Sequence, residues 1–269
     1  MIGLRDNTEK ELPGPLGWLF LGLILMMTVD SVAGVDNPAR WLCLFFLGAV
    51  FVRRAWDLAP CALLIFCLYV GGQWFPDWVW KVPTASLFFP LVLVWLSCLP
   101  FPRLRAGFRW ARKGDLNQVT WFLVVLVSLV SAIALVLWAL WTDYLGLATA
   151  MMSTVKSVPL WFMLLVGIPG FALANAFAEE AVYRGVVQDA LEKRFGNWPW
   201  LVIAAQASAF AALHYRSGFP NGKVGYLMTF VFACMLGLLR RRSEGMLAPY
   251  VAHVAADAVI GVTLLLLAA

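Results

Sequence analysis

The chain has 269 residues, of which 62% are hydrophobic and only 13% are charged, and its formal net charge is +5. This composition lies far outside that of soluble globular proteins and indicates a polytopic membrane protein. The positive charge is explained by loops that contact anionic lipid, so a nucleic-acid partner is not expected. The five cysteines lie in apolar runs without CxxC spacing, which excludes a disulfide framework and a thiolate metal site.

Apolar runs that suit membrane helices recur along the whole chain. They cover residues 14 to 33, 40 to 52, 59 to 75, 86 to 101, 118 to 142, 159 to 178, 199 to 214, 224 to 239 and 246 to 268. The second run is short for a span, so we expect an all-α, polytopic transmembrane helical bundle with eight or nine spans. The first run follows a mixed-charge start and lacks a small-residue cleavage site, which predicts a retained helix.

The distribution of Lys and Arg predicts a cytoplasmic N-terminus, because alternating spans then give most of the twenty basic residues to inside loops. The predicted inside residues are Arg5, Lys10, Arg53, Arg54, Arg103, Arg105, Arg109, Arg112, Lys113, Arg184, Lys193, Arg194, Arg240, Arg241 and Arg242. The predicted outside residues are Arg40, Lys81, Lys156, Arg216 and Lys223. We therefore expect an integral multi-pass protein of a bacterial inner (cell) membrane whose surface contacts the lipid bilayer.

A basic stretch at 102 to 115 divides the chain into two parts. Residues 1–115 are expected to form accessory N-terminal transmembrane helices, and residues 116–269 contain the chemically interesting side chains. In the second part, Gly167, Pro169 and Gly170 interrupt a run and predict a bend, since proline removes a backbone hydrogen bond. From residue 171 the pattern is helical to about residue 195.

The turn Gly196-Asn197-Trp198-Pro199 predicts a helical hairpin. Glu179 lies seventeen residues before Gly196 and His214 eighteen residues after it. At about 1.5 Å per residue, both are roughly 25 Å from the turn and should reach similar depth. Hydropathy alone instead places these two residues near opposite membrane faces. We give the hairpin geometry precedence and predict that Glu179, His214 and His253 meet in one cavity.

Ionisable side chains in apolar surroundings are costly and mark working sites in membrane proteins. The only two histidines, His214 and His253, both lie in such surroundings, and so do the paired acids Glu179 and Glu180. These acids and histidines are therefore the first candidates for chemistry.

Helical spacing relates these residues to their neighbours. Glu180 and Arg184 are four residues apart and share a face, whereas Glu179 points about 100° away. His253 and Asp257 have the same spacing, so the carboxylate can orient the imidazole. A purely structural interpretation also fits each pair: an ordinary ion pair beside a solvated Glu179, and a local buried polar pair at His253.

Together these residues form three ordered motifs: E-E-x-x-x-R from Glu179 to Arg184, F-x-x-x-H from Phe210 to His214, and H-x-x-x-D from His253 to Asp257. The set resembles the signature of the CPBP family, the CAAX protease and bacteriocin-processing group of intramembrane proteases, which includes type II CAAX prenyl endopeptidases. The sequence Tyr183-Arg184-Gly185 adds to the resemblance, which covers roughly residues 170 to 262.

The resemblance implies an intramembrane endopeptidase that hydrolyses a peptide bond of a membrane-associated or lipidated protein or peptide. Glu179 would be the general base on a water that His214 also holds. Glu180 and Arg184 would position the helix and tune that base, and His253 would stabilise the oxyanion. Asp257 departs from the commoner family Asn, and since an ionised Asp cannot donate a hydrogen bond, we expect it to orient His253.

Three alternatives remain open. A zinc-dependent metalloprotease would use Glu179, His214 and His253 as ligands, with Glu180 as a possible fourth, although the sequence has no H-E-x-x-H helix. The same cluster would also suit a noncatalytic membrane scaffold or immunity protein. A transporter would use embedded acids and histidines as a proton relay, but paired broken helices are not seen. We favour the glutamate and water mechanism, which needs no cofactor.

Overall fold

The structure is a computed structural model that describes residues 13–33, 39–69, 83–108, 110–142, 158–216 and 218–268. These residues form helices and their connections, and no β-strand occurs among them, which confirms the all-α prediction. The predicted inside residues Arg5, Lys10 and Arg109 and the predicted outside residues Lys81 and Lys156 lie outside the described residues.

Each apolar run predicted from the sequence carries a helix. In chain order the elements are α1 (Pro15–Ala33), α2 (Ala39–Val52), α3 (Ala59–Tyr69), α5 (Pro83–Cys98), α6 (Pro102–Arg105), the 3-10 turn η2 (Ala106–Phe108), α7 (Gln118–Trp141), α9 (Leu160–Phe162), the π-helical stretch η3 (Met163–Gly167), α10 (Ile168–Glu180), the π-helical stretch η4 (Ala181–Val187), α11 (Gln188–Phe195), α12 (Pro199–Arg216), α13 (Gly222–Ser243) and α14 (Leu247–Ala268).

Five of the described helices are long and apolar enough to cross a membrane: Pro15–Ala33, Gln118–Trp141, Leu160–Phe195, Gly222–Ser243 and Leu247–Leu266. Three shorter apolar helices cover Arg40–Val52, Ala59–Tyr69 and Thr84–Cys98. Helix α12 is not among either group, because Gln206, His214 and Arg216 lower its hydrophobicity. The protein is thus an integral membrane protein, but the expected count of eight or nine spans is not confirmed.

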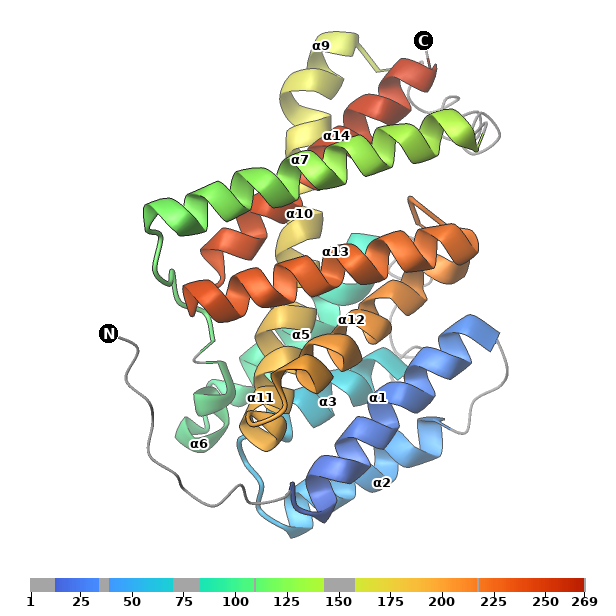
Figure 1. Ribbon diagram of the computed structural model, residues 1–269. Helices are drawn as coiled ribbons and strands as arrows, with labels where there is room; N and C mark the ends of the chain where they lie inside the picture. The colour runs from blue at the N-terminus through green and yellow to red at the C-terminus, as the bar shows by residue number, and fades with distance from the viewer. Residues whose placement is uncertain are drawn as a thin grey trace.

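The long helices pack side by side in a closed ring. Along the ring, α1 contacts α2, α2 contacts α3, and the sequence of neighbours continues through α5, α10, α14, α7, α13 and α12 back to α1. Figure 1 shows α7, α13, α12 and α1 running in similar directions, one below the other. The helices of the first part of the chain, α1, α2, α3 and α5, form one arc of this ring, and those of the second part form the other arc, so both parts border its interior.

Helices α9, α10 and α11, together with η3 and η4, form one continuous helix, Leu160–Phe195. In Figure 1 it descends across the ring from the top of the view to α11 at the lower left. The irregularity expected at Gly167 and Pro169 is present as the π-helical stretch η3, which ends at Gly167. A π-helical turn is a known response to a missing backbone hydrogen bond, and such turns are frequent at functional sites.

One end of the ring gathers the turns before α3, α7, α12 and α14. Arg194 of α11 pairs with Asp57 at 2.7 Å, and Arg240 of α13 pairs with Glu192 at 2.8 Å. The backbone N–H of Met246 donates to the carbonyl of Arg112 at 2.8 Å, which joins the loop before α7 to the turn before α14. This end lies at the left of Figure 1, where α6, α11 and the start of α7 meet.

The described basic residues lie mainly at this end of the ring. The described members at this end are Arg53, Arg54, Arg103, Arg105, Arg112, Lys113, Lys193, Arg194, Arg240, Arg241 and Arg242. At the other end Arg216 donates to the carbonyls of Val32 and Ala33, at the last turn of α1. The prediction that Arg184 belongs to an inside loop is wrong, because Arg184 is fully buried within η4, where Glu180 compensates its charge.

Candidate active site

Glu180 and Arg184 form the ion pair expected from their spacing. Nη1 of Arg184 donates to Oε1 of Glu180 at 2.9 Å, and neither side chain is more than marginally exposed. The guanidinium also lies over the ring of Phe210, 4.6 Å from its centroid, and Nη2 donates to the carbonyl of Ala233 at 3.4 Å. A buried charge requires such pairing, so Arg184 joins α12 and α13 to the helix that carries the glutamates.

His253 of α14 lies between the two glutamates. Its Nδ1 is 2.8 Å from Oε1 of Glu180, and its Nε2 is 3.3 Å from Oε2 of Glu179. The rings of Phe210 and Phe232 meet the imidazole edge-on and fix its plane. Glu179 is only 7% exposed, so the structural alternative of a solvated Glu179 does not apply.

Asp257 is close to His253, as their spacing predicts, but it is not the nearest acid. Its Oδ1 lies 3.7 Å from Nε2 of His253, beyond hydrogen-bond range, whereas Glu180 is within that range of Nδ1. The hydrogen-bonded orienting acid in this structure is therefore Glu180. Sequence spacing favoured Asp257 because it counts only residues on one helix, and Glu180 reaches His253 from another.

His214 lies in the last turn of α12, and the chain then turns at Gly218. A Cβ atom at Gly218 would lie 2.8 Å from Nδ1 of His214, and Gly218 has a φ of +90°. Both facts require glycine here, because a side chain would be strained and would displace the imidazole. Nδ1 of His214 is buried and has no hydrogen-bond partner within the described part of the chain.

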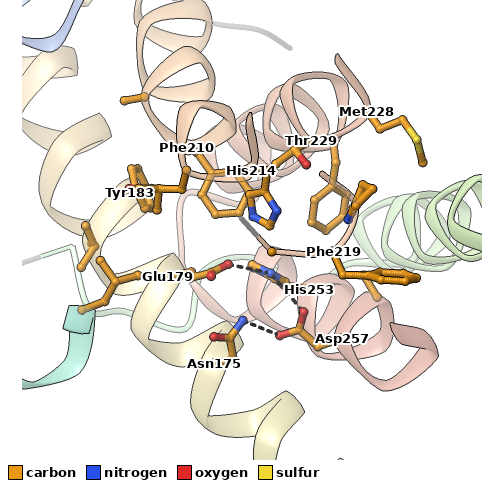
Figure 2. Close-up of a pocket in the computed structure, with 18 of the residues that line it drawn as sticks. Asn175, Glu179, Tyr183, Phe210, His214, Phe219, Met228, Thr229, His253 and Asp257 are labelled. Atoms are coloured by element: carbon orange, nitrogen blue, oxygen red, sulfur yellow. Dashed lines mark hydrogen bonds and ion pairs between the residues drawn. The ribbon is translucent and has the colours of Figure 1, made fainter. Parts of the chain in front are cut away.

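A cavity of about 770 Å³ lies inside the ring, and Glu179, His214, His253 and Asp257 all line it. Figure 2 shows Glu179 pointing toward His253, with His214 across the pocket from Asp257. The equal arms of the hairpin about Gly196 therefore bring Glu179 and His214 to one cavity. Most of the remaining wall is apolar, and it includes Ile24 of α1, Leu64 of α3 and Leu87 of α5.

The first 115 residues thus contribute to the wall of the cavity, which sequence patterns did not indicate. Two polar residues were also missed. Asn175 donates from Nδ2 to Oδ2 of Asp257 at 3.2 Å, and the hydroxyl of Thr84 donates to Oδ1 of Asn175 at 2.7 Å. A signal for Asn175 did exist, since it is a polar residue in an apolar helix, four residues before Glu179.

The zinc alternative requires Glu179, His214 and His253 to converge on one metal ion. Among the described residues, no group of three or more His, Cys, Asp and Glu side chains is placed to hold a metal ion. Both ring nitrogens of His253 face glutamate oxygens, and Oε1 of Glu180 is already paired with Arg184. We derive no chemistry from a zinc ion.

Comparison with known proteins gives one finding. Residues 157–259 match the family model described as type II CAAX prenyl endopeptidase Rce1-like. The matched segment contains all six residues singled out from the sequence, and its limits are close to those of the resemblance seen in the motifs. No curated protein and no solved structure is similar enough to the chain to count as a match.

Proposed function

We propose that this membrane protein is an endopeptidase that uses a glutamate-activated water, because residues 157–259 match the family model of type II CAAX prenyl endopeptidases. The observation that carries the proposal is the meeting of Glu179, His214 and His253 at one cavity inside the ring. A carboxylate, two imidazoles and a substrate-sized space are the parts that peptide hydrolysis requires.

Glu179 is the general base in this mechanism. Its carboxylate accepts a proton from a water held between it and His214, and the water oxygen then attacks the carbonyl carbon of the scissile peptide bond. Glu179 suits this role better than Glu180, because Oε1 of Glu180 is engaged by both Arg184 and His253. Glu179 lines the cavity and has a longer contact, 3.3 Å to Nε2 of His253, so its carboxylate is placed to exchange a proton with water.

His253 stabilises the oxyanion formed by that attack. With a proton on each ring nitrogen, Nδ1–H donates to Glu180 and Nε2–H becomes a donor at the cavity wall, near Glu179. A preorganised donor aimed at developing charge is among the largest contributions to catalysis. Glu179 then returns its proton to the amide nitrogen, the C–N bond breaks, and the products are a new carboxylate and a free amine.

Glu180 and Arg184 act on the site through His253. Their ion pair holds the oxygen that orients Nδ1, and burial makes that pair intolerant of losing either member. We accordingly assign Glu180 and Arg184 as positioning residues, and Asp257 as a further charged neighbour of Nε2.

The substrate proposed is a peptide bond of a membrane-associated or lipidated protein or peptide, because the cavity wall is mainly apolar and lies within the helix ring. Prenylated CAAX proteins are substrates named for the matching family, and they are the first class to test. The proposed location is a bacterial inner membrane.

The test uses the purified protein in liposomes. A farnesylated peptide that ends in a CAAX sequence, with a fluorophore and a quencher on either side of the Cys–aliphatic bond, reports cleavage as fluorescence. The same peptide without the farnesyl group tests lipid recognition. We expect wild type to cleave the farnesylated peptide, and both Glu179→Gln and His214→Ala to lose cleavage by at least about a hundredfold, the scale of one general base.

Glu244→Gln is the matched control, because Glu244 is exposed in the turn after α13. Unchanged unfolding temperatures show that the site variants fold. If Glu179→Gln retains cleavage, Glu179 is not the base. If wild type cleaves neither peptide, comparing membrane proteomes of cells carrying wild type or Glu179→Gln searches for another substrate, and identical proteomes favour a noncatalytic scaffold.

A further inference from the structure

A chain of hydrogen bonds connects α5, in the first part of the sequence, with the acid beside His253. The hydroxyl of Thr84 donates to Oδ1 of Asn175 at 2.7 Å, and Nδ2 of Asn175 donates to Oδ2 of Asp257 at 3.2 Å. Figure 2 shows the last of these bonds below His253. Three helices, α5, α10 and α14, therefore meet through three polar side chains.

The order of donors in this chain follows from chemistry. An ionised carboxylate only accepts hydrogen bonds, so the amide of Asn175 must turn Nδ2 toward Asp257. Oδ1 of Asn175 then faces Thr84, and the hydroxyl of Thr84 must donate. The carboxylate of Asp257 thus determines which end of the amide faces it, and Thr84 holds the other end of the amide in place.

The bond to Asn175 also determines where the carboxylate of Asp257 lies. With Oδ2 held, Oδ1 stays 3.7 Å from Nε2 of His253, whereas Oε2 of Glu179 is 3.3 Å away. Asp257 is one helical turn from His253 and is buried, so a released carboxylate has a short path to Nε2. An Asp257 that bonded Nε2 would occupy the donor that an oxyanion needs.

We propose that Asn175, fixed by Thr84, is a positioning residue that holds the carboxylate of Asp257 away from Nε2 of His253. This inference rests on the proposed function, in which Nε2–H serves the oxyanion. It gives the accessory first part of the chain a role at the site, because Thr84 belongs to α5. It also pairs the Asp at 257, where the family more often has Asn, with an amide that donates to its second carboxylate oxygen.

An exchange of the two side chains tests the proposal. Asn175→Asp places two carboxylates together and breaks the bond, so kcat on the farnesylated peptide should fall roughly 10- to 100-fold, the range for a hydrogen bond to a charged group. KM should change less than kcat, because the positioning role acts through His253 on the chemical step. The double variant Asn175→Asp with Asp257→Asn restores an amide–carboxylate pair with its ends reversed, and kcat should recover.

If Asn175→Asp only disturbed packing, adding Asp257→Asn would not restore kcat, so recovery of kcat in the double variant supports the positioning role. A double variant no more active than Asn175→Asp alone would overturn the positioning role. Thr84→Val should lower kcat in the same direction. Its matched control is Thr142→Val, the same isosteric change at a threonine whose hydroxyl, within the described part of the chain, donates to the carbonyl of Trp138. Equal kcat for Thr84→Val and wild type would remove Thr84 from the chain.

Unfolding temperatures of wild type, Asn175→Asp, Asp257→Asn and the double variant separate this inference from the proposed function. If wild type cleaves no peptide, the proposed function fails in wild type itself. The unfolding temperatures then still test the contact between Asn175 and Asp257. Asn175→Asp should lower the unfolding temperature, and Asp257→Asn in that background should restore it. Equal destabilisation in both backgrounds would show that Asn175 does not hold Asp257.

Discussion

Charges buried among apolar helices must be paired, and the pairing decides which acid is free to react. Oε1 of Glu180 accepts a hydrogen bond from Nη1 of Arg184 at 2.9 Å and lies 2.8 Å from Nδ1 of His253. The side chains of Arg184 and His253 are both buried. Glu179 has only the longer contact to Nε2 of His253. The E-E-x-x-x-R spacing predicted the ion pair correctly, because i and i+4 side chains on one helix must be neighbours. It did not predict that Glu180 would also orient His253, since that contact depends on how α14 packs.

The first prediction concerns Asp257. Asp257→Asn should keep kcat within about tenfold of wild type, equivalent to less than about 1.4 kcal/mol. The amide oxygen of Asn can accept from Asn175, and its N–H group adds a donor beside Nε2 of His253. Asp257→Leu lacks both abilities and should lose far more activity. Cleavage of the farnesylated peptide by the two variants measures this difference. Equal losses would show that the negative charge of Asp257 itself is needed.

A second prediction at this scale concerns metal. The proposed mechanism uses Glu179 as a base on water and needs no metal ion, so purified enzyme treated with a strong chelator should keep its activity. Metal analysis before and after treatment is the accompanying measurement. Zinc present at one per chain, lost together with activity and restored together with it, would contradict the metal-free mechanism. Proteolysis would still stand, since the same groups would then serve a metal-bound water.

At the scale of elements, the hairpin around Gly196 was predictable because helix rise is constant. Equal arms placed Glu179 and His214 at similar depth, and the structure has both at one cavity. An irregularity at Gly167 and Pro169 was predictable, but its π-helical form in η3 was not, and η4 was not predictable at all, because the wider hydrogen-bonded turns have no periodic pattern in the sequence. The packing of the loop residue Trp110 against η4 could not be expected either. That contact depends on residues far apart in the chain.

The third prediction tests this contact. A Cβ atom at Gly185 would lie 2.7 Å from the ring of Trp110, so Gly185→Ala should displace the ring and lower the free energy of unfolding by about 1–3 kcal/mol. Gly170→Ala is the matched control, since nothing lies within 4 Å of a Cβ there and alanine is the better helix former. Thermal unfolding in detergent compares the two. If Gly185→Ala is as stable as Gly170→Ala, Trp110 does not constrain η4.

At the scale of the whole molecule, composition was sufficient to predict a helical membrane protein but not its ring. Hydropathy locates each helix separately, and nothing in it specifies that α5 lies beside α10 or that α1 lies beside α12. The division into residues 1–115 and 116–269 remains a prediction. Its two parts nevertheless share one cavity, with Ile24, Leu64 and Leu87 in the same wall as Glu179. The first part is therefore placed to act directly at the site.

The last prediction concerns orientation in the membrane. The loop before α7 and the turn before α14 are joined by the bond from Met246 to Arg112, so they must lie on one side, and their basic residues assign that side to the cytoplasm. Lys113→Cys and Arg242→Cys introduce exposed thiols there, and Lys223→Cys introduces one at the other end. The native cysteines Cys43, Cys61, Cys67 and Cys98 are buried, and Cys234 is partly buried, so the unsubstituted protein gives the background.

With a membrane-impermeant maleimide applied to intact cells, Lys223→Cys should be labelled, whereas Lys113→Cys and Arg242→Cys should react only after the membrane is permeabilised. The reverse labelling pattern would show that the protein has the opposite orientation in the membrane. Labelling of position 113 and position 242 from opposite sides would contradict the shared end itself, because a hydrogen-bonded loop and turn cannot be separated by a bilayer. The orientation also determines from which side a peptide substrate approaches Glu179.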